Sequence, residues 1–289
     1  DMYYSTDLDA TEEGMLATIE QLRGGAKDRL SFNNIRLILG TLISRSNQLN
    51  VYQSYSIPEN HSIVRARHLE KAGEWFESIA DLGPPQPEKT LQYGRCHRPG
   101  RSVAYCSLYE GTALTEIRAE LGSQYVISTF SMPAGSILLP VGELDYFRRT
   151  EQTYLGEAHE RSKANYKEIL DRDDWALIAL FDAFLAEEFI TPAETQVDYK
   201  VTSAMADVLF HGGLPFPEPI DAIIYPSVAF RAGTNFAIQS ASFQSSKVRL
   251  VESETKIIEV TKALGYGIYD YKVLSRLKAV RGDGSLEWY

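Results

Sequence analysis

The first fifty residues carry apolar positions at spacings of three and four, the period of an amphipathic helix. One such run covers residues 11–22 and stops at Gly24-Gly25, and a second covers residues 31–48. Two helices are too few to bury a core of their own. We therefore expect residues 1–58 to pack on the remainder of the chain or to belong to a longer helical domain.

From residue 62 onward the pattern changes to short runs with strand periodicity, separated by a few helical ones. Residues 62–67 alternate, which places Arg65 and Arg67 on the same face of a strand. Further strands are predicted at residues 103–106, 124–132, 136–141, 222–225, 235–238, 247–251 and 256–261, and helices at 112–121, 173–190 and 194–209. These runs predict a mixed α+β domain over residues 59–289, behind a helical N-terminal region over residues 1–58.

Composition and charge narrow the classes of function. The chain has 289 residues, 44% of them hydrophobic, and a formal net charge of −10. Such a chain is typical of a globular protein, and its charge argues against a broad basic surface for nucleic acid. No long apolar run is free of charges, so no membrane span is expected. With two cysteines and no visible secretory signal at its start, the protein is expected to be cytoplasmic.

Several familiar chemistries lack their motifs. The sequence contains no CxxC, no HExxH and no cluster of histidines with cysteines, so no metal site is expected. It also lacks a P-loop, a GxGxxG turn after a strand and a GxSxG elbow. The five histidines are scattered, and only His97 lies in a suggestive segment.

That segment covers residues 93–107 and gathers positive charge in an otherwise acidic chain. Arg95, Arg98 and Arg101 stand around the turn Pro99-Gly100. Converging guanidinium groups would suit a diphosphate, because arginine offers planar, two-pronged hydrogen bonds. The alternative is an ordinary solvated basic loop.

The order of several short motifs resembles the RES domain family. Arg95 is followed at the family's spacing by Gly100, by Tyr105 and by Ala113-Leu114-x-Glu116. The other matching motifs are Tyr225-Pro226-Ser227, Gly233-Thr234-Asn235 and the opening strand Val64-Arg65-Ala66-Arg67. One position departs from the pattern, because His97 stands where the family usually has asparagine.

The resemblance implies a fold and a chemistry. It implies an ADP-ribosyltransferase-like split mixed β-sheet flanked by helices, which binds NAD+ as its substrate and breaks the nicotinamide–ribose bond. It also implies a bacterial toxin that degrades NAD+ by hydrolysis or phosphorolysis and is restrained by a cognate antitoxin or immunity protein, typically a small helix-turn-helix protein. Two other functions stay open: mono-ADP-ribosyl transfer to a protein or metabolite, and a non-catalytic protein that binds NAD+ or a partner.

The resemblance also assigns candidate residues. Catalytic candidates are Arg95, Tyr105, Glu116 and Ser227, and candidates for binding NAD+ are Arg65, Arg95, His97, Tyr105, Ser227 and Asn235. A carboxylate such as Glu116 can stabilise the positive charge that develops on ribose as neutral nicotinamide leaves. Four of these candidates have a structural alternative of their own: an exposed helix carboxylate for Glu116, a core ring for Tyr105, an exposed strand residue for Arg65 and turn chemistry for Ser227.

Overall fold

A computed structural model of the chain describes residues 12–23, 28–48, 55–156, 160–212, 218–230 and 233–289. These residues form two compact units, each built from segments that are far apart in sequence. Unit 1 comprises the described parts of residues 1–55, 90–101 and 137–225. Unit 2 comprises the described parts of residues 56–89, 102–136 and 226–289.

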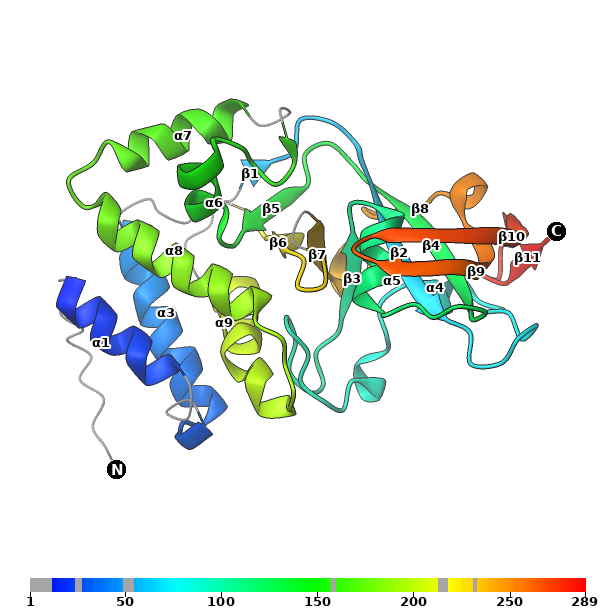
Figure 1. Cartoon of the computed structure of the whole chain (residues 1–289), viewed down its shortest axis with the longest axis horizontal. Helices are drawn as coiled ribbons and strands as arrows, with labels where there is room; N and C mark the ends of the chain where they lie inside the picture. Colours follow the sequence, from blue (N-terminus) through cyan, green and yellow to red (C-terminus); the bar gives the residue numbers. More distant parts are fainter. Residues whose placement is uncertain (1–11, 24–27, 49–54, 157–159, 213–217, 231–232) are drawn as a thin grey trace. The chain divides into compact units, whose positions relative to one another are not determined.

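Unit 1 is mainly helical (Figure 1). Its helices are α1 (Glu12–Leu22), α3 (Phe32–Gln48), α6 (Glu143–Thr150), α7 (Glu160–Leu170), α8 (Trp175–Ile190) and α9 (Lys200–His211), and its strands β5 (Ile137–Pro140) and β6 (Ala222–Pro226) run parallel. Helix α1 packs on α8 and α3 packs on α9. The two predicted N-terminal helices therefore exist, and they pack on helices from the second half of the chain.

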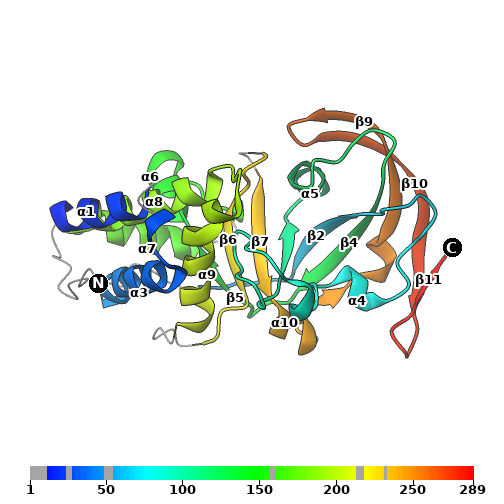
Figure 2. The same ribbon diagram turned by 90° about the horizontal axis from the view of Figure 1, so that it is seen from below.

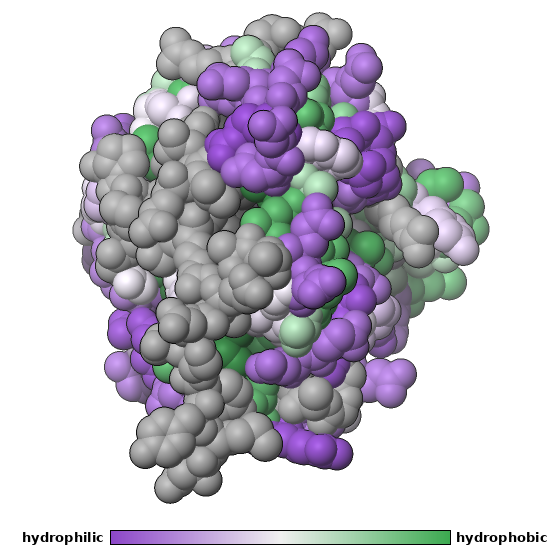
Figure 3. Space-filling view, turned by 90° about the vertical axis from the view of Figure 1, so that its left-hand side faces the viewer, coloured by the Kyte–Doolittle hydropathy of each residue, from purple (hydrophilic) through white to green (hydrophobic). Residues whose placement is uncertain are grey.

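Helices α1 and α3 each carry apolar residues that are not buried against the rest of unit 1. Ile19 of α1 and Ile35 of α3 are buried, whereas Leu16 is 48% exposed and Leu37 is 60% exposed. On this side of the molecule, hydrophobic atoms show between hydrophilic side chains (Figure 3). Isolated exposed leucines are normal on a protein surface, so Leu16 and Leu37 do not by themselves indicate a binding surface.

Two buried carboxylates hold the start of α6. Asp182 on α8 accepts hydrogen bonds from the backbone N–H groups of Gly142 and Asp145, both at 2.9 Å. Glu143 accepts one from the backbone N–H of Tyr154 and one from the hydroxyl of Tyr166, both at 2.6 Å. Burial raises the pKa of Glu143 to about 7 and that of Asp182 to about 6. Hydrogen bonds alone do not offset the desolvation of these two charges.

We expect the stability of the protein to fall as the pH rises from about 4.5 to about 7, because the folded state holds a proton on Glu143 that the unfolded state has released. Glu143→Gln mimics the protonated acid, so the variant should lose this part of the pH dependence. At pH 8 its free energy of unfolding should exceed that of the wild type by about 2–3 kcal/mol, and the difference should vanish near pH 4.5. Urea unfolding across the pH range measures this.

Glu168→Gln is a matched control, because Glu168 is an exposed carboxylate on α7. That variant should follow the wild-type curve. A Glu143→Gln protein that is no more stable than the wild type at pH 8 would contradict the assignment.

Unit 2 is built on an antiparallel sheet. Its strands follow the order β7 (Thr234–Gln239), β3 (Val103–Ser107), β2 (His61–His68), β4 (Gln124–Met132), β9 (Lys256–Gly265), β10 (Ile268–Val280) and β11 (Leu286–Trp288). The short strand β8 (Arg249–Leu250) also pairs with β4, and β1 (Tyr55–Ser56) is only two residues long. The helices are α4 (Ile79–Leu82), α5 (Glu110–Glu116) and α10 (Ser240–Gln244).

The two faces of this sheet carry different helices. Ala113 and Leu114 of α5 pack against one face, in a core cluster that includes Val64, Ala66 and Ile127. Figure 2 shows α5 inside the curve of β4 and the β9–β10 hairpin. The opposite face carries α4 and α10, because alternate strand residues such as Phe130 point that way and Phe130 contacts Phe243 of α10.

The predicted α+β class is confirmed, with parallel strands in unit 1 and antiparallel strands in unit 2. The predicted strand at 124–132 matches β4, and the strands at 62–67 and 103–106 match β2 and β3 to within two residues. The predicted helix over residues 112–121 is wrong at its end, because α5 stops at Glu116 and Leu121, beyond it, is 68% exposed. The predicted division at residues 58 and 59 stays a prediction.

Candidate functional site

Glu116 is the last residue of α5, and its side chain is half-buried. The helix ends in a Schellman turn: the N–H of Ala119 donates to the carbonyl of Leu114, and the N–H of Arg118 donates to that of Thr115. Arg118 takes the left-handed conformation that this turn requires, with φ 52°. The backbone that carries Glu116 is therefore fixed on both sides of the residue.

The structure brings Ser227 and Asn235 to the carboxylate of Glu116. Its Oε1 accepts a hydrogen bond from Asn235 Nδ2 at 2.6 Å and one from Ser227 Oγ at 2.5 Å. Ser107 Oγ donates to Asn235 Oδ1 at 2.7 Å, which fixes the orientation of the amide. We call Glu116, Ser227, Asn235 and Ser107 the Glu116 cluster.

The geometry of the Glu116 cluster leaves one carboxylate oxygen available. Both hydrogen bonds go to Oε1, and Oε2 accepts none from the residues that the structure describes. A carboxylate at the C-terminal end of a helix is electrostatically unfavourable unless donors offset it. Ser227, which is 0% exposed, and Asn235, at 4%, supply those donors from the protein interior. Among the residues that the structure describes, the arrangement thus holds a carboxylate by one oxygen and places no donor on the other.

The loop that carries Ser227 is closed by its own hydrogen bonds. The backbone N–H of Ser227 donates to the carbonyl of Gly233, and the N–H of Phe230 donates to Ser227 Oγ at 2.9 Å. Gly233 packs on α5 so closely that a methyl group there would lie 2.5 Å from Thr112 Cγ2. The glycine of the Gly233-Thr234-Asn235 motif is thus needed for contact between the loop and the helix.

Tyr105 lies on the same face of the sheet as Asn235. Strand β3 pairs with β7 in the register Tyr105↔Ala237 and Ser107↔Asn235, and residues two apart on a strand share a face. The side chain of Tyr105 is half-buried. Tyr105 and Asn235 therefore face the same side of the sheet as α5, which carries Glu116.

Arg65 lies on the opposite face of the sheet from Glu116. Its neighbours on β2, Val64 and Ala66, face α5, so Arg65 faces away from that helix. There its guanidinium donates to the carbonyls of Leu82 and Gly83, and burial lowers its pKa to about 10. The structure therefore does not bring Arg65, a candidate for binding NAD+, to the Glu116 cluster.

Two of the three arginines of the 93–107 segment bind different partners in unit 1. Arg95 donates to the carbonyls of Phe189 at 2.6 Å and of Glu188 and Thr191, at the end of α8, and its guanidinium lies over the ring of Tyr199. Arg98 pairs instead with Asp207 on α9. Arg95 and Arg98 therefore bind different helices within unit 1, and these two guanidinium groups do not converge as expected.

His97 covers Gly94. The two residues exchange backbone hydrogen bonds across a tight turn, and a methyl group on Gly94 would lie 2.1 Å from Cε1 of the His97 ring. Burial lowers the pKa of His97 below its ordinary value of 6.5, so the ring is neutral at pH 7. The histidine that replaces the family's asparagine is therefore packed on the glycine that precedes Arg95.

This contact gives a testable pair of variants. Gly94→Ala should destabilise the protein by about 1–3 kcal/mol because the added methyl group overlaps the His97 ring. In a His97→Ala background the same change should cost less than about 1 kcal/mol, because the ring is gone. Urea unfolding of the four proteins measures the coupling, and equal losses in both backgrounds would contradict the contact.

Three residues of the site had no assignment from sequence. Ser107 and Thr112 are ordinary residues at the end of a strand and the start of a helix, and Phe230 lies between two motifs. Ser107 could have been found from register, because pairing Cys106 with Phe236 places it opposite Asn235. Nothing in the sequence marks Thr112 or Phe230.

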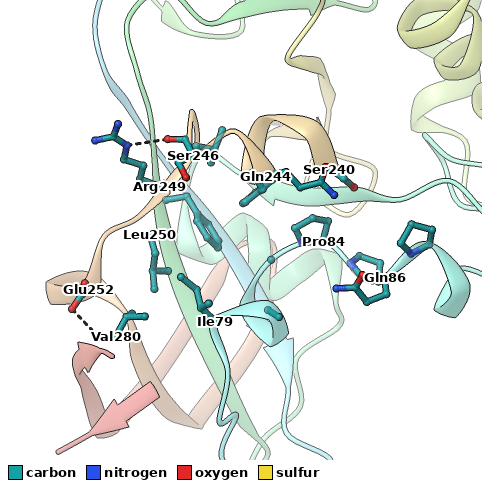
Figure 4. Close-up of a pocket in the computed structure, with 17 residues that line it drawn as sticks. Ile79, Pro84, Gln86, Ser240, Gln244, Ser246, Arg249, Leu250, Glu252 and Val280 are labelled. Atoms are coloured by element: carbon teal, nitrogen blue, oxygen red, sulfur yellow. Dashed lines mark hydrogen bonds between the residues drawn. The ribbon is translucent and has the colours of Figure 1, made fainter. Parts of the chain in front are cut away.

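Unit 2 also contains a pocket of about 490 Å³ on the face opposite α5 (Figure 4). Prolines of the 84–87 loop and Phe243 of α10 line it, and Arg249 donates to the carbonyl of Ser246 at its edge. The Glu116 cluster does not line it.

Within the described ranges, no group of three or more His, Cys, Asp or Glu side chains could hold a metal ion. None of the helices in these ranges is long and apolar enough to cross a membrane.

Comparison with known proteins gives one match. The sequence profile of the RES domain matches residues 63–256 of the 289-residue chain. This segment includes all four members of the Glu116 cluster. No curated protein and no solved structure matches this sequence.

Proposed function

The chain belongs to the RES domain family, and from this membership and the geometry of the Glu116 cluster we propose that it is an NAD+-degrading enzyme. The bond that it breaks joins nicotinamide to ribose. The observation that carries the proposal is the state of Glu116: one carboxylate oxygen is held by Ser227 and Asn235, while the other accepts no hydrogen bond from the described residues.

The chemistry requires such a carboxylate. When the C1′–N bond of NAD+ breaks, its electron pair leaves with nicotinamide, which becomes neutral, and positive charge moves to the ribose ring. A fixed negative charge beside the ribose stabilises this transition state more than the ground state, and this difference accelerates the reaction. Water then adds to C1′ and releases a proton, or phosphate adds and forms a phosphate ester of ADP-ribose.

The other members of the cluster have positioning roles in this scheme. Ser227 Oγ donates to Glu116 and accepts from Phe230, so its hydroxyl holds the carboxylate and is not a nucleophile. Asn235 orients the same oxygen while Ser107 fixes its amide. Tyr105, on the same face of the sheet, is proposed to contact the nicotinamide or a ribose hydroxyl.

The contacts to the diphosphate are a further part of the proposal. Arg95 and His97 are the residues that the family pattern assigns to NAD+, together with Arg65. Arg95 would exchange the carbonyl oxygens of α8 for phosphate oxygens, which guanidinium binds more strongly because they are charged. The position of Arg65 on the far face of the sheet does not support a contact beside Glu116.

We also propose a toxin that a partner restrains. A cytoplasmic enzyme that drains NAD+ must be inhibited in the cell that makes it, and family membership supports a cognate antitoxin, of the helix-turn-helix type. Expression of the protein without that partner should lower cellular NAD+ and stop growth. Growth at an unchanged NAD+ level would contradict this part of the proposal.

The test of the reaction is the analysis of its products. Purified protein incubated with NAD+ should release nicotinamide, and chromatography with mass detection identifies the second product. Free ADP-ribose indicates a glycohydrolase, and a phosphate ester formed in phosphate buffer indicates a phosphorylase. A mass gain of one ADP-ribose unit on an acceptor would replace the proposal by ADP-ribosyl transfer, and NAD+ binding without release would replace it by a binding protein.

A further inference from the structure

The β9–β10 hairpin begins at the last residue of the segment that matches the RES domain. Its tip, Gly265-Tyr266-Gly267, takes three consecutive positive φ angles of 76°, 53° and 77°. This tight turn directs the backbone of Gly267 toward α5. The hairpin is therefore a candidate for a role beside the family's own motifs.

The hairpin tip contacts α5 one residue before Glu116. The N–H of Gly267 donates to Thr115 Oγ1 at 3.1 Å, and Thr115 Oγ1 donates to the carbonyl of Gly111 at 2.7 Å. A methyl group on Gly111 would lie 2.4 Å from the carbonyl oxygen of Gly267. Helix and hairpin thus approach each other backbone to backbone, a distance that only glycine permits.

The same tip also contacts the loop that supplies Ser227. A methyl group on Gly267 would lie 3.3 Å from the ring of Phe230, and the N–H of Phe230 donates to Ser227 Oγ. The tip therefore lies against both segments whose side chains meet at Glu116 Oε1.

A second set of contacts ties the start of α5 to the body of the hairpin. Lys256 Nζ pairs with Glu110 Oε1 at 2.7 Å and donates to the hydroxyl of Tyr271 at 2.8 Å. Tyr271 in turn donates to Glu110 Oε2 at 2.5 Å. The Lys256 side chain is 12% exposed and that of Glu110 is 32% exposed, so the ion pair is partly buried, and the hydroxyl of Tyr271 adds hydrogen bonds to both partners.

We infer that the β9–β10 hairpin positions Glu116 for catalysis, with Thr115 and Gly267 as positioning residues that act through α5 and the Ser227 loop. The inference rests on the proposed function for its kinetic consequence. It goes beyond that function because it assigns a positioning role to a hairpin that extends beyond the residues matched by the RES domain. A carboxylate that stabilises transition-state charge must be held to within a fraction of an ångström, since a misplacement of about 1 Å can cost about a hundredfold in rate.

The test compares Thr115→Val with Thr115→Ser. Valine keeps the shape but loses both hydrogen bonds of the hydroxyl, whereas serine retains them. We expect Thr115→Val to lower kcat about 10- to 100-fold with KM changed less than about threefold, and Thr115→Ser to stay within about threefold of the wild type. Gly111→Ala, which forces the carbonyl of Gly267 away, should act like Thr115→Val.

Thr18→Val is the matched control. Thr18 is also a buried helix threonine whose hydroxyl donates four residues back, to the carbonyl of Gly14 at 2.8 Å, but it lies in α1 of unit 1. This variant loses the same kind of bond and should keep the wild-type kcat. Rates are measured well below the Tm of every variant, so that a loss of stability alone does not lower kcat.

Crystal structures of wild type and Thr115→Val add a readout that does not depend on turnover. In the variant, the bonds from Ser227 and Asn235 to Glu116 should lengthen by about 0.5 Å or more. Unchanged bonds together with an unchanged kcat would overturn the inference. A wild type that releases no nicotinamide would overturn the proposed function instead, and the bond lengths would then decide the positioning role by themselves.

Discussion

Glu116→Gln should release nicotinamide from NAD+ about a thousandfold more slowly than the wild type, with KM changed less than about threefold. Glutamine keeps the shape of the side chain, and its oxygen can still accept the hydrogen bonds of Ser227 and Asn235. Only the negative charge is lost. A preorganised group that interacts with the charge developing in the transition state lowers the activation free energy by about 3–4 kcal/mol, which corresponds to a rate change of about two to three powers of ten.

Steady-state release of nicotinamide, followed by chromatography, measures this effect. Glu120→Gln is the matched control, because Glu120 is an exposed carboxylate four residues further along the chain. It removes the same charge and should leave the rate unchanged. A Glu116→Gln protein with the wild-type kcat would show that the cluster is not the catalytic centre.

Asp207→Asn should destabilise unit 1 by about 2–4 kcal/mol, because it removes a buried carboxylate that bridges two arginines. Asp207 on α9 is 7% exposed and pairs with Arg36 of α3 at 2.6 Å and with Arg98 at 3.1 Å. The amide would leave two cations facing each other without a counter-charge. Burial tends to raise the pKa of Asp207, but hydrogen bonds from Arg98 and Arg36 outweigh it and lower the pKa below 3.8.

The sign of that shift predicts a pH dependence. A carboxyl whose pKa is lowered on folding stabilises the protein above its unfolded pKa, and the effect is lost as the pH falls through the folded value. The difference in stability between Asp207→Asn and the wild type should therefore be largest at neutral pH and should shrink below about pH 4. Thermal unfolding at several pH values measures it. Asp270→Asn is the control, because it removes an exposed ion pair with Lys262 and should leave the Tm unchanged. An Asp207→Asn protein with the Tm of the wild type would contradict the bridging role of Asp207.

The sequence predicted the parts of the site that local pattern encodes. Glu116, Ser227 and Asn235 stand in short motifs of fixed order, and the structure joins all three by hydrogen bonds. Strands such as β4 were predicted because a short run rich in β-branched and aromatic residues, buried on both faces of the sheet, is typical of a strand. The sequence could not show which face of the sheet Arg65 occupies relative to Glu116, since that depends on where α5 packs.

Two other features depend on contacts that no local pattern reports. The arginines at 95 and 98 bind carbonyls and a carboxylate from helices about a hundred residues away, so their charge is used for packing within unit 1. Strand β10 has no predicted counterpart, because charged residues such as Lys272 and Arg276 interrupt its apolar positions. Its alternation after the Gly265-Tyr266-Gly267 turn was the signal that could have revealed it.

The long sequence separations within the Glu116 cluster have a consequence for synthesis of the protein. Ser227 and Asn235 follow Glu116 by 111 and 119 residues, and β7 must pair with β3 before Asn235 can reach Ser107. A nascent chain on the ribosome, or one cut short before Ser227, has the carboxylate without either of these two donors. Translation itself thus delays assembly of the site until most of the polypeptide has been made.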